Sequence, residues 1–134
     1  MYEPIRTKSV HTMADADPDF PHRSREEELD TQLVGHLAAL LAVTDALGQT
    51  DAAERITARL TALRGVRPPH VPAPASGSPA ALHRRALALA GRALVVAASR
   101  ADTTSAILAA QLMDTHTAAL RAPDDRDRTL AVTG

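Results

Sequence analysis

Apolar residues recur every three or four positions in four separate stretches of the chain, and this spacing predicts helices. The predicted helices span residues 25–47, 51–64, 79–100 and 103–121. The first has the most regular pattern, because its apolar positions fall on one helix face. Those positions are Leu29, Leu33, Leu37, Leu40, Thr44 and Leu47.

Capping residues mark the ends of the first two predicted helices. Ser24 with Glu27 three residues later has the spacing of a capping box, and Gly48 supplies a C-terminal stop. Asp51 can cap the second helix, and Gly65 can end it. The short connection between the two helices predicts an antiparallel hairpin.

A proline-rich segment separates this hairpin from the rest of the chain. Residues 65–79 contain five prolines, so residues 65–78 are predicted to be an extended linker that crosses to a second hairpin. Ser78 followed by Pro79 has the order of a helix N-cap and its first residue.

The boundary between the third and fourth helices is less sharply marked. Asp102, Thr103, Thr104 and Ser105 are competing N-cap residues and predict a break, but no glycine or proline enforces it. One continuous helix over residues 79–121 is the alternative.

Together these elements predict an all-α protein, a four-helix bundle of two antiparallel hairpins joined by the proline-rich crossover. The bundle domain spans residues 24–121. Flexible segments are expected at residues 1–23 and 122–134, which lack a periodic apolar pattern. Met13 is a second candidate start within the first of these.

Composition narrows the possible functions. The 134 residues contain no cysteine and no tryptophan, and the aromatic residues are Tyr2 and Phe20. Thiol chemistry and cysteine-bound metals are therefore excluded, and base-stacking surfaces are not expected. No apolar run has the length of a membrane span, and the N-terminus lacks the order of a secretory signal, so we expect a cytoplasmic protein without membrane association.

The predicted core is poor in large side chains, since 28 residues are alanine. A small bundle of this kind is marginally stable alone, and the third helix is nearly free of charge. We therefore expect a homodimer that pairs the second hairpins of two copies. The candidate self-association residues are Leu94, Val95, Leu108 and Leu112.

Charge is unevenly distributed along the chain. Residues 55–101 contain eight arginines and no acidic residue. We favour the interpretation that glutamates of the first helix neutralise these arginines, because the net charge of the chain is −1. Lys8 is the only lysine, and this scarcity argues against nucleic-acid binding. Arg84, Arg85 and Arg59 are the candidate residues for contact with a partner.

Two histidines could meet inside the bundle. His36 and His116 each lie one turn from core leucines on their helices. The sequence has neither Glu-x-x-His nor His-x-x-x-His spacing, so it predicts no bound metal or other cofactor.

The sequence contains no nucleophile elbow, phosphate-binding loop or paired catalytic carboxylates. We therefore expect a non-enzymatic interaction protein that self-associates and presents a helix face or its terminal arms to an unidentified protein partner. A ligand- or metal-responsive bundle, with a site between the helices, is one alternative. Weak nucleic-acid binding through residues 55–85 is another.

Overall fold

The computed structural model describes residues 20–69 and 77–133, and the side chains of residues 24–69 and 77–122. Within these residues the chain forms four α-helices and no strand. The helices are α2 (Phe20–Ala46), α3 (Thr50–Arg64), α4 (Pro79–Ser99) and α5 (Thr103–Thr133). The predicted all-α fold is confirmed. Residues 1–19 of the predicted N-terminal arm lie outside the described residues.

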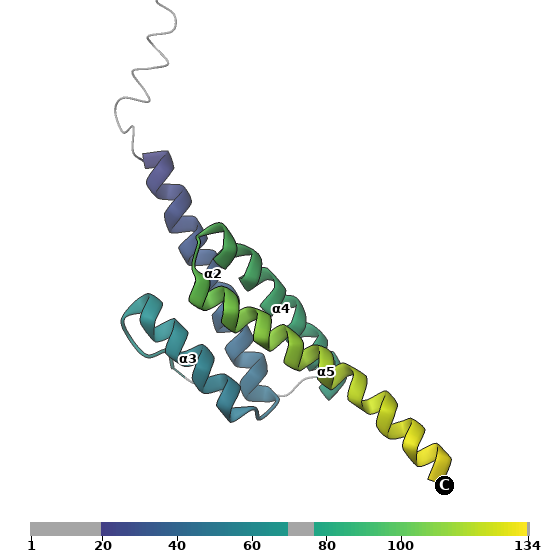
Figure 1. Cartoon of the computed structure of the whole chain (residues 1–134). Coiled ribbons are helices and arrows are strands. Elements are labelled where there is room, and N and C mark those ends of the chain that lie inside the picture. The colour runs from purple at the N-terminus through teal and green to yellow at the C-terminus, as the bar shows by residue number, and fades with distance from the viewer. Residues whose placement is uncertain (1–19, 70–76, 134) are drawn as a thin grey trace, which may run out of the picture.

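The four helices form two antiparallel hairpins, α2 with α3 and α4 with α5 (Figure 1). The end of α3 and the start of α4 lie at opposite ends of the bundle, so the connection between them is the predicted crossover. Helix α4 packs against both α2 and α5, whereas α3 packs mainly against α2 and only lightly against α5. The ring of four helices is therefore least closed between α3 and α5.

Glycine ends both helices of the first hairpin, as the sequence predicted. Gly48 adopts φ +73° after α2, and Gly65 adopts φ +82° after α3. At the first of these caps, the Gly48 amide donates to the Asp45 carbonyl at 3.0 Å and the Gln49 amide to the Thr44 carbonyl at 3.2 Å. Glycine suits these positions because a left-handed backbone strains residues that carry a Cβ atom.

The predicted cap of α4 is also confirmed. The Ser78 hydroxyl accepts a hydrogen bond from the Ala81 amide at 3.1 Å, and Pro79 occupies the first turn. Proline costs no hydrogen bond there, because the first amide groups of a helix have no partner within the helix.

A sharp break separates α4 from α5. Ala101 adopts φ +58°, the Ala101 amide donates to the Ala98 carbonyl, and the Asp102 amide donates to the Ala97 carbonyl. Asp102 then caps α5, since its carboxylate accepts from the Ser105 amide at 3.0 Å and from the Ser105 hydroxyl at 2.7 Å. The predicted break is confirmed, and the alternative of one continuous helix is wrong.

The start of α2 differs from the prediction. The helix begins at Phe20, so residues 20–23 are helical and the expected capping box of Ser24 and Glu27 is wrong, because both residues lie inside the helix. Pro21 falls in the first turn, where it is compatible with helix.

Helix α3 begins at Thr50 after Gln49, and the Gln49 side chain makes no capping hydrogen bond. The expectation that Asp51 caps this helix is wrong. Asp51 instead lies within the first turn, where the helix dipole favours its negative charge.

Helix α5 continues to Thr133, beyond its predicted end at residue 121. Pro123 lies inside this helix, where a proline removes one hydrogen bond and can be accommodated by a kink. The sequence that follows also places Asp124 one turn before Arg128, a spacing that favours helix.

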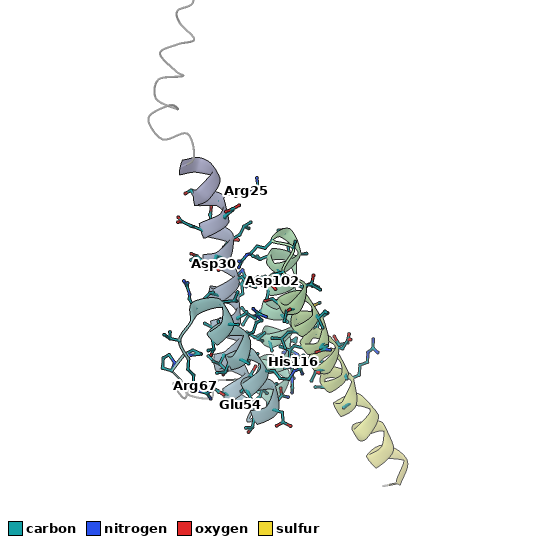
Figure 2. All side chains as sticks on the ribbon, turned by 60° about the vertical axis from the view of Figure 1, so that its left-hand side comes forward. Arg25, Asp30, Glu54, Arg67, Asp102 and His116 are labelled. Atoms are coloured by element: carbon teal, nitrogen blue, oxygen red, sulfur yellow. The ribbon has the colours of Figure 1, made fainter. Side chains whose placement is uncertain are left out.

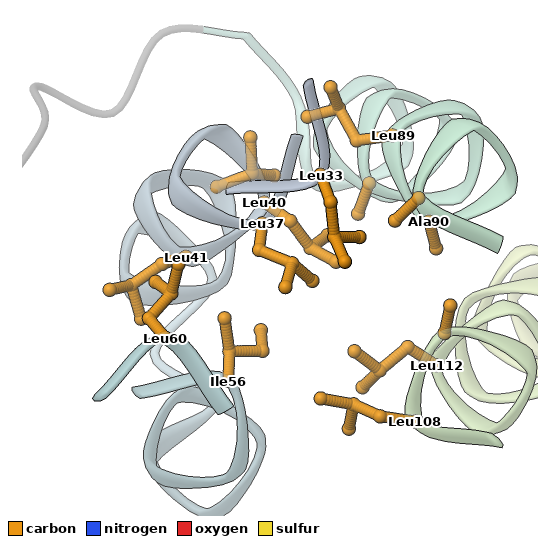
Figure 3. Close-up of a cluster of buried hydrophobic side chains, with 14 of the residues drawn as sticks. Leu33, Leu37, Leu40, Leu41, Ile56, Leu60, Leu89, Ala90, Leu108 and Leu112 are labelled. Carbon is orange, nitrogen blue, oxygen red and sulfur yellow. The ribbon is translucent and has the colours of Figure 1, made fainter. Parts of the chain in front are cut away.

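Leucine and isoleucine side chains from all four helices converge on the core (Figure 3). Leu33, Leu37 and Leu40 of α2 and Ile56 of α3 are fully buried, and Leu112 of α5 is 1% exposed. These are the faces that the apolar spacing predicted.

Helix α4 contributes mainly small side chains to the core. Its buried residues are Ala86, Leu89, Ala90, Ala93, Val96 and Ala97. Val95 on the outer side is 65% exposed, so this helix is not covered on that side although it is nearly free of charge. The reason is that α2 and α5 cover only part of its circumference.

Candidate functional site

A groove lies between α3 and α5, where the bundle is least closed. Its volume is about 340 Å³. We call it the α3–α5 groove. It is lined by residues of both helices: Arg55, Ala58, Arg59, Thr104, Ile107, Leu108 and Gln111. Leu108 is 7% exposed and belongs to the core, whereas Ile107 is 52% exposed. The groove therefore combines an apolar wall with two arginines.

The two arginines of the groove lie one turn apart on α3. The Arg55 guanidinium donates a hydrogen bond to the Gln111 side-chain carbonyl across the groove. Arg59 has its Nε atom buried, with no hydrogen-bond partner in the described part of the chain. This guanidinium is therefore incompletely satisfied.

Asp102 stands at the end of the groove nearest the α4–α5 break. Burial opposes its charged form, but hydrogen bonds from Ser105 and the charges of Arg59 and Arg100 outweigh burial and lower the pKa of Asp102. The carboxylate therefore stays ionised at neutral pH and fixes the start of α5.

A pair of histidines joins α4 to α5. The Nδ1 atoms of His83 and His116 are 2.9 Å apart, and the ring centroids are 5.1 Å apart. His116 is fully buried, and its Nε2 atom has no hydrogen-bond partner among the described residues. Burial and the neighbouring charge of His83 lower the pKa of His116, so the buried ring is neutral at physiological pH.

The sequence left open whether His36 meets His116, and the structure shows that it does not. His36 is half-buried on α2, and the imidazole that contacts His116 belongs to His83 of α4. The apolar spacing gives no signal for His83, which is followed by the charged residues Arg84 and Arg85. No group of three or more histidine, cysteine or acidic side chains suited to a metal ion occurs in residues 24–69 and 77–122.

Acidic residues of the first hairpin neutralise part of the arginine block. Asp30 of α2 contacts Arg100 at 3.1 Å and Arg64 at 3.8 Å, and Glu54 of α3 contacts Arg67 at 3.1 Å (Figure 2). Each pair is partly exposed, so each contributes at most about 1 kcal/mol to stability. The Asp30 contacts tie the ends of α3 and α4 to α2.

Other arginines of the block remain at the surface. Arg84, Arg85 and Arg92 of α4 are exposed and make no ion pair with the side chains that the structure describes. Of the three partner-binding candidates, Arg84 and Arg85 therefore lie together near the start of α4, while Arg59 lies apart from them in the α3–α5 groove.

The four self-association candidates divide into two pairs. Leu108 and Leu112 belong to the protein's own core. Leu94 is half-buried, and Val95 is 65% exposed. Only the latter pair is available to a second molecule.

An uncharged strip runs along the outer junction of α4 and α5. A Cβ atom added to Gly91 would lie 3.9 Å from Met113 Cε, so these two residues lie near each other across the two antiparallel helices. Steps of three and four residues along each helix from this contact give four positions on α4 and four on α5. All eight residues are partly or fully exposed, and none is charged. We call these residues the α4–α5 seam: Leu87, Gly91, Leu94, Ala98, Ala106, Ala110, Met113 and Thr117.

Within the described residues, no helix is both long and apolar enough to cross a membrane. No protein-family model, no curated protein and no solved structure matches this chain.

Proposed function

We propose that this chain is a non-enzymatic interaction protein that forms a homodimer through the α4–α5 seam and presents exposed helix residues to a protein partner. The observation that carries the proposal is the absence of charge from the eight seam positions, which all retain exposure. The charged residues of α4 and α5 lie at other positions around the helices.

A second copy of the chain fits the seam better than a charged partner does. Small residues such as Gly91 and Ala110 allow helices to approach closely, and Leu94 and Met113 supply apolar contact area. Val95 borders the seam and is 65% exposed. A twofold axis across this surface would bring each apolar position against an apolar position of the other copy.

The non-enzymatic part of the proposal is supported by the placement of the histidine pair. His116 is fully buried, so a substrate in solution has no access to its ring. The pair joins two helices, and this is a structural role.

The oligomeric state tests the dimer. We expect light scattering at micromolar concentration to give twice the 14.1 kDa of the chain. Val95→Asp should dissociate the dimer because it places a charge beside the seam. Ile107→Asp is the matched control, since it introduces the same charge at an exposed aliphatic position outside the seam. A monomeric wild-type protein, or equal behaviour of the two variants with both folded, would contradict the proposal.

Arg84 and Arg85 are the residues that we assign to the protein partner. Both are exposed in the second turn of α4 and make no ion pair with the side chains that the structure describes. Two adjacent unpaired arginines favour an acidic partner. Complexes isolated from the native host should contain a protein that the Arg84→Ala/Arg85→Ala variant loses, and a partner retained by that variant would refute the assignment.

A further inference from the structure

We propose that the α3–α5 groove is a binding site for a medium-chain aliphatic carboxylate. The aliphatic chain would lie against Ile107, Leu108 and Ala58, and the carboxylate would be held by Arg55 and Arg59. This site lies on a different side of α5 from the seam, so the inference does not depend on the dimer.

Ile107 gives the groove an exposed apolar side chain. This side chain is 52% exposed although it stands beside Leu108, which is buried in the core. The groove volume of about 340 Å³ lies at the lower end of the range usual for small-ligand sites. An aliphatic chain in the groove would remove apolar surface from water on both sides of the contact.

The charge of the groove selects the ligand's head group. Two of the seven lining residues are arginines and none is acidic, and Asp102 at the end of the groove offsets only part of this positive charge, so an anion is favoured over an amine. The buried Arg59 Nε atom has no hydrogen-bond partner among the described residues, and a carboxylate is the acceptor that a guanidinium binds best. The hydrogen bond from Arg55 to Gln111 occupies one nitrogen of the Arg55 guanidinium and holds this group across the groove.

The length of the groove selects the chain length. Its α5 wall runs from Thr104 to Gln111, which is about 10 Å along a helix axis. A carboxylate with a chain of medium length fills this distance, whereas a long-chain fatty acid would extend beyond the wall into water.

Isoleucine-methyl NMR offers a direct test, because the sequence contains three isoleucines. Ile107 reports on the groove and Ile56 on the closed core, while Ile5 lies outside the described residues. We expect decanoate to shift the Ile107 methyl signal saturably and to leave the fully buried Ile56 nearly unchanged. Decanol and decylamine are the matched probes without a negative charge, and each should bind at least about tenfold more weakly.

Variants separate this site from general binding to the surface. Arg59→Gln and Arg55→Gln should each weaken decanoate binding about tenfold or more, whereas Arg92→Gln removes an exposed arginine outside the groove and should leave it unchanged. Two arginine variants are used so that a folding defect in one does not decide the result.

The proposal is overturned if Ile107 does not respond to decanoate, if decanol binds as tightly, or if Arg92→Gln weakens binding as much as Arg59→Gln. Val95→Asp should bind decanoate like the wild type even where it abolishes the dimer. Failure of the ligand site and failure of the dimer are therefore measured independently.

Discussion

Replacing Ala101 by glycine tests the local geometry that divides the second hairpin. Ala101 has φ +58°, whereas Gly48 and Gly65 occupy the corresponding left-handed positions after α2 and α3. Alanine carries a Cβ atom that crowds the following carbonyl in this conformation. Ala101→Gly should relieve that strain without removing an observed side-chain hydrogen bond.

The expected magnitude follows from two opposing effects. A left-handed backbone costs a residue with a Cβ atom about 1–2 kcal/mol relative to glycine. Glycine increases the conformational entropy of the unfolded chain, which offsets about 0.4–1 kcal/mol of this gain. The variant should therefore be more stable by about 0.5–1 kcal/mol, corresponding to a rise in Tm of about 2–6 °C.

Urea and thermal unfolding measured at one protein concentration would determine the difference, because self-association adds to apparent stability. Ala88→Gly is the matched control, since Ala88 is exposed in the interior of α4. Glycine there should destabilise the protein by about 1 kcal/mol. If α4 and α5 were one continuous helix, both substitutions would destabilise, so a loss of stability in Ala101→Gly would refute the reasoning.

Two further substitutions test the polar contacts of α5. His116→Leu should be nearly neutral near pH 8, because it removes a buried Nε2 atom that has no described partner but also removes the contact with the half-exposed His83 ring. The lowered pKa of His116 means that the unfolded chain binds a proton before the folded chain does as the pH falls below 6.5. The free energy of unfolding measured as a function of pH should therefore show that the variant becomes more stable relative to the wild type toward about pH 5. A relative stability that falls over this pH range would contradict this account. Asp102→Ala should lower stability by about 1–2 kcal/mol at neutral pH, because it removes the cap of α5. Since the pKa of Asp102 is lowered in the folded protein, the difference in the free energy of unfolding between the wild type and this variant should fade as the pH drops below 3.8. Chemical denaturation across that pH range measures the difference, and a difference that persists would contradict this account.

Most of the helix ends were predictable because their signals are local. Gly48, Gly65 and the Ser78–Pro79 pair act on backbone groups within a few residues, so their effects depend little on the rest of the fold. The break after α4 belongs with these, since Asp102 and Ser105 form their contacts within one turn.

The starts of α2 and α3 were predicted less well. A residue suited to capping, such as Ser24 or Asp51, caps a helix only if the preceding turn does not itself become helical. In both cases the helix extends past the candidate cap, to Phe20 and Thr50.

The candidate sites depended on how the helices dock. A position on a helix turns by about 100° per residue, so a small change in rotation or axial offset decides which side chain of the next helix it meets. The apolar spacing identified the core face of α5 but did not distinguish His83 from His36 as the neighbour of His116.

Apolar spacing and capping residues specify four helices, their apolar faces and a crossover between two hairpins, because these signals act over short stretches of chain. The docking of the helices sets which arginines meet an acid, which aliphatic side chains remain exposed and where a groove is left. Those properties arise from the packing of α3 against α2 with little contact to α5. They belong to pairs of surfaces that are distant in sequence, and their relative placement is set by the packing of the whole core.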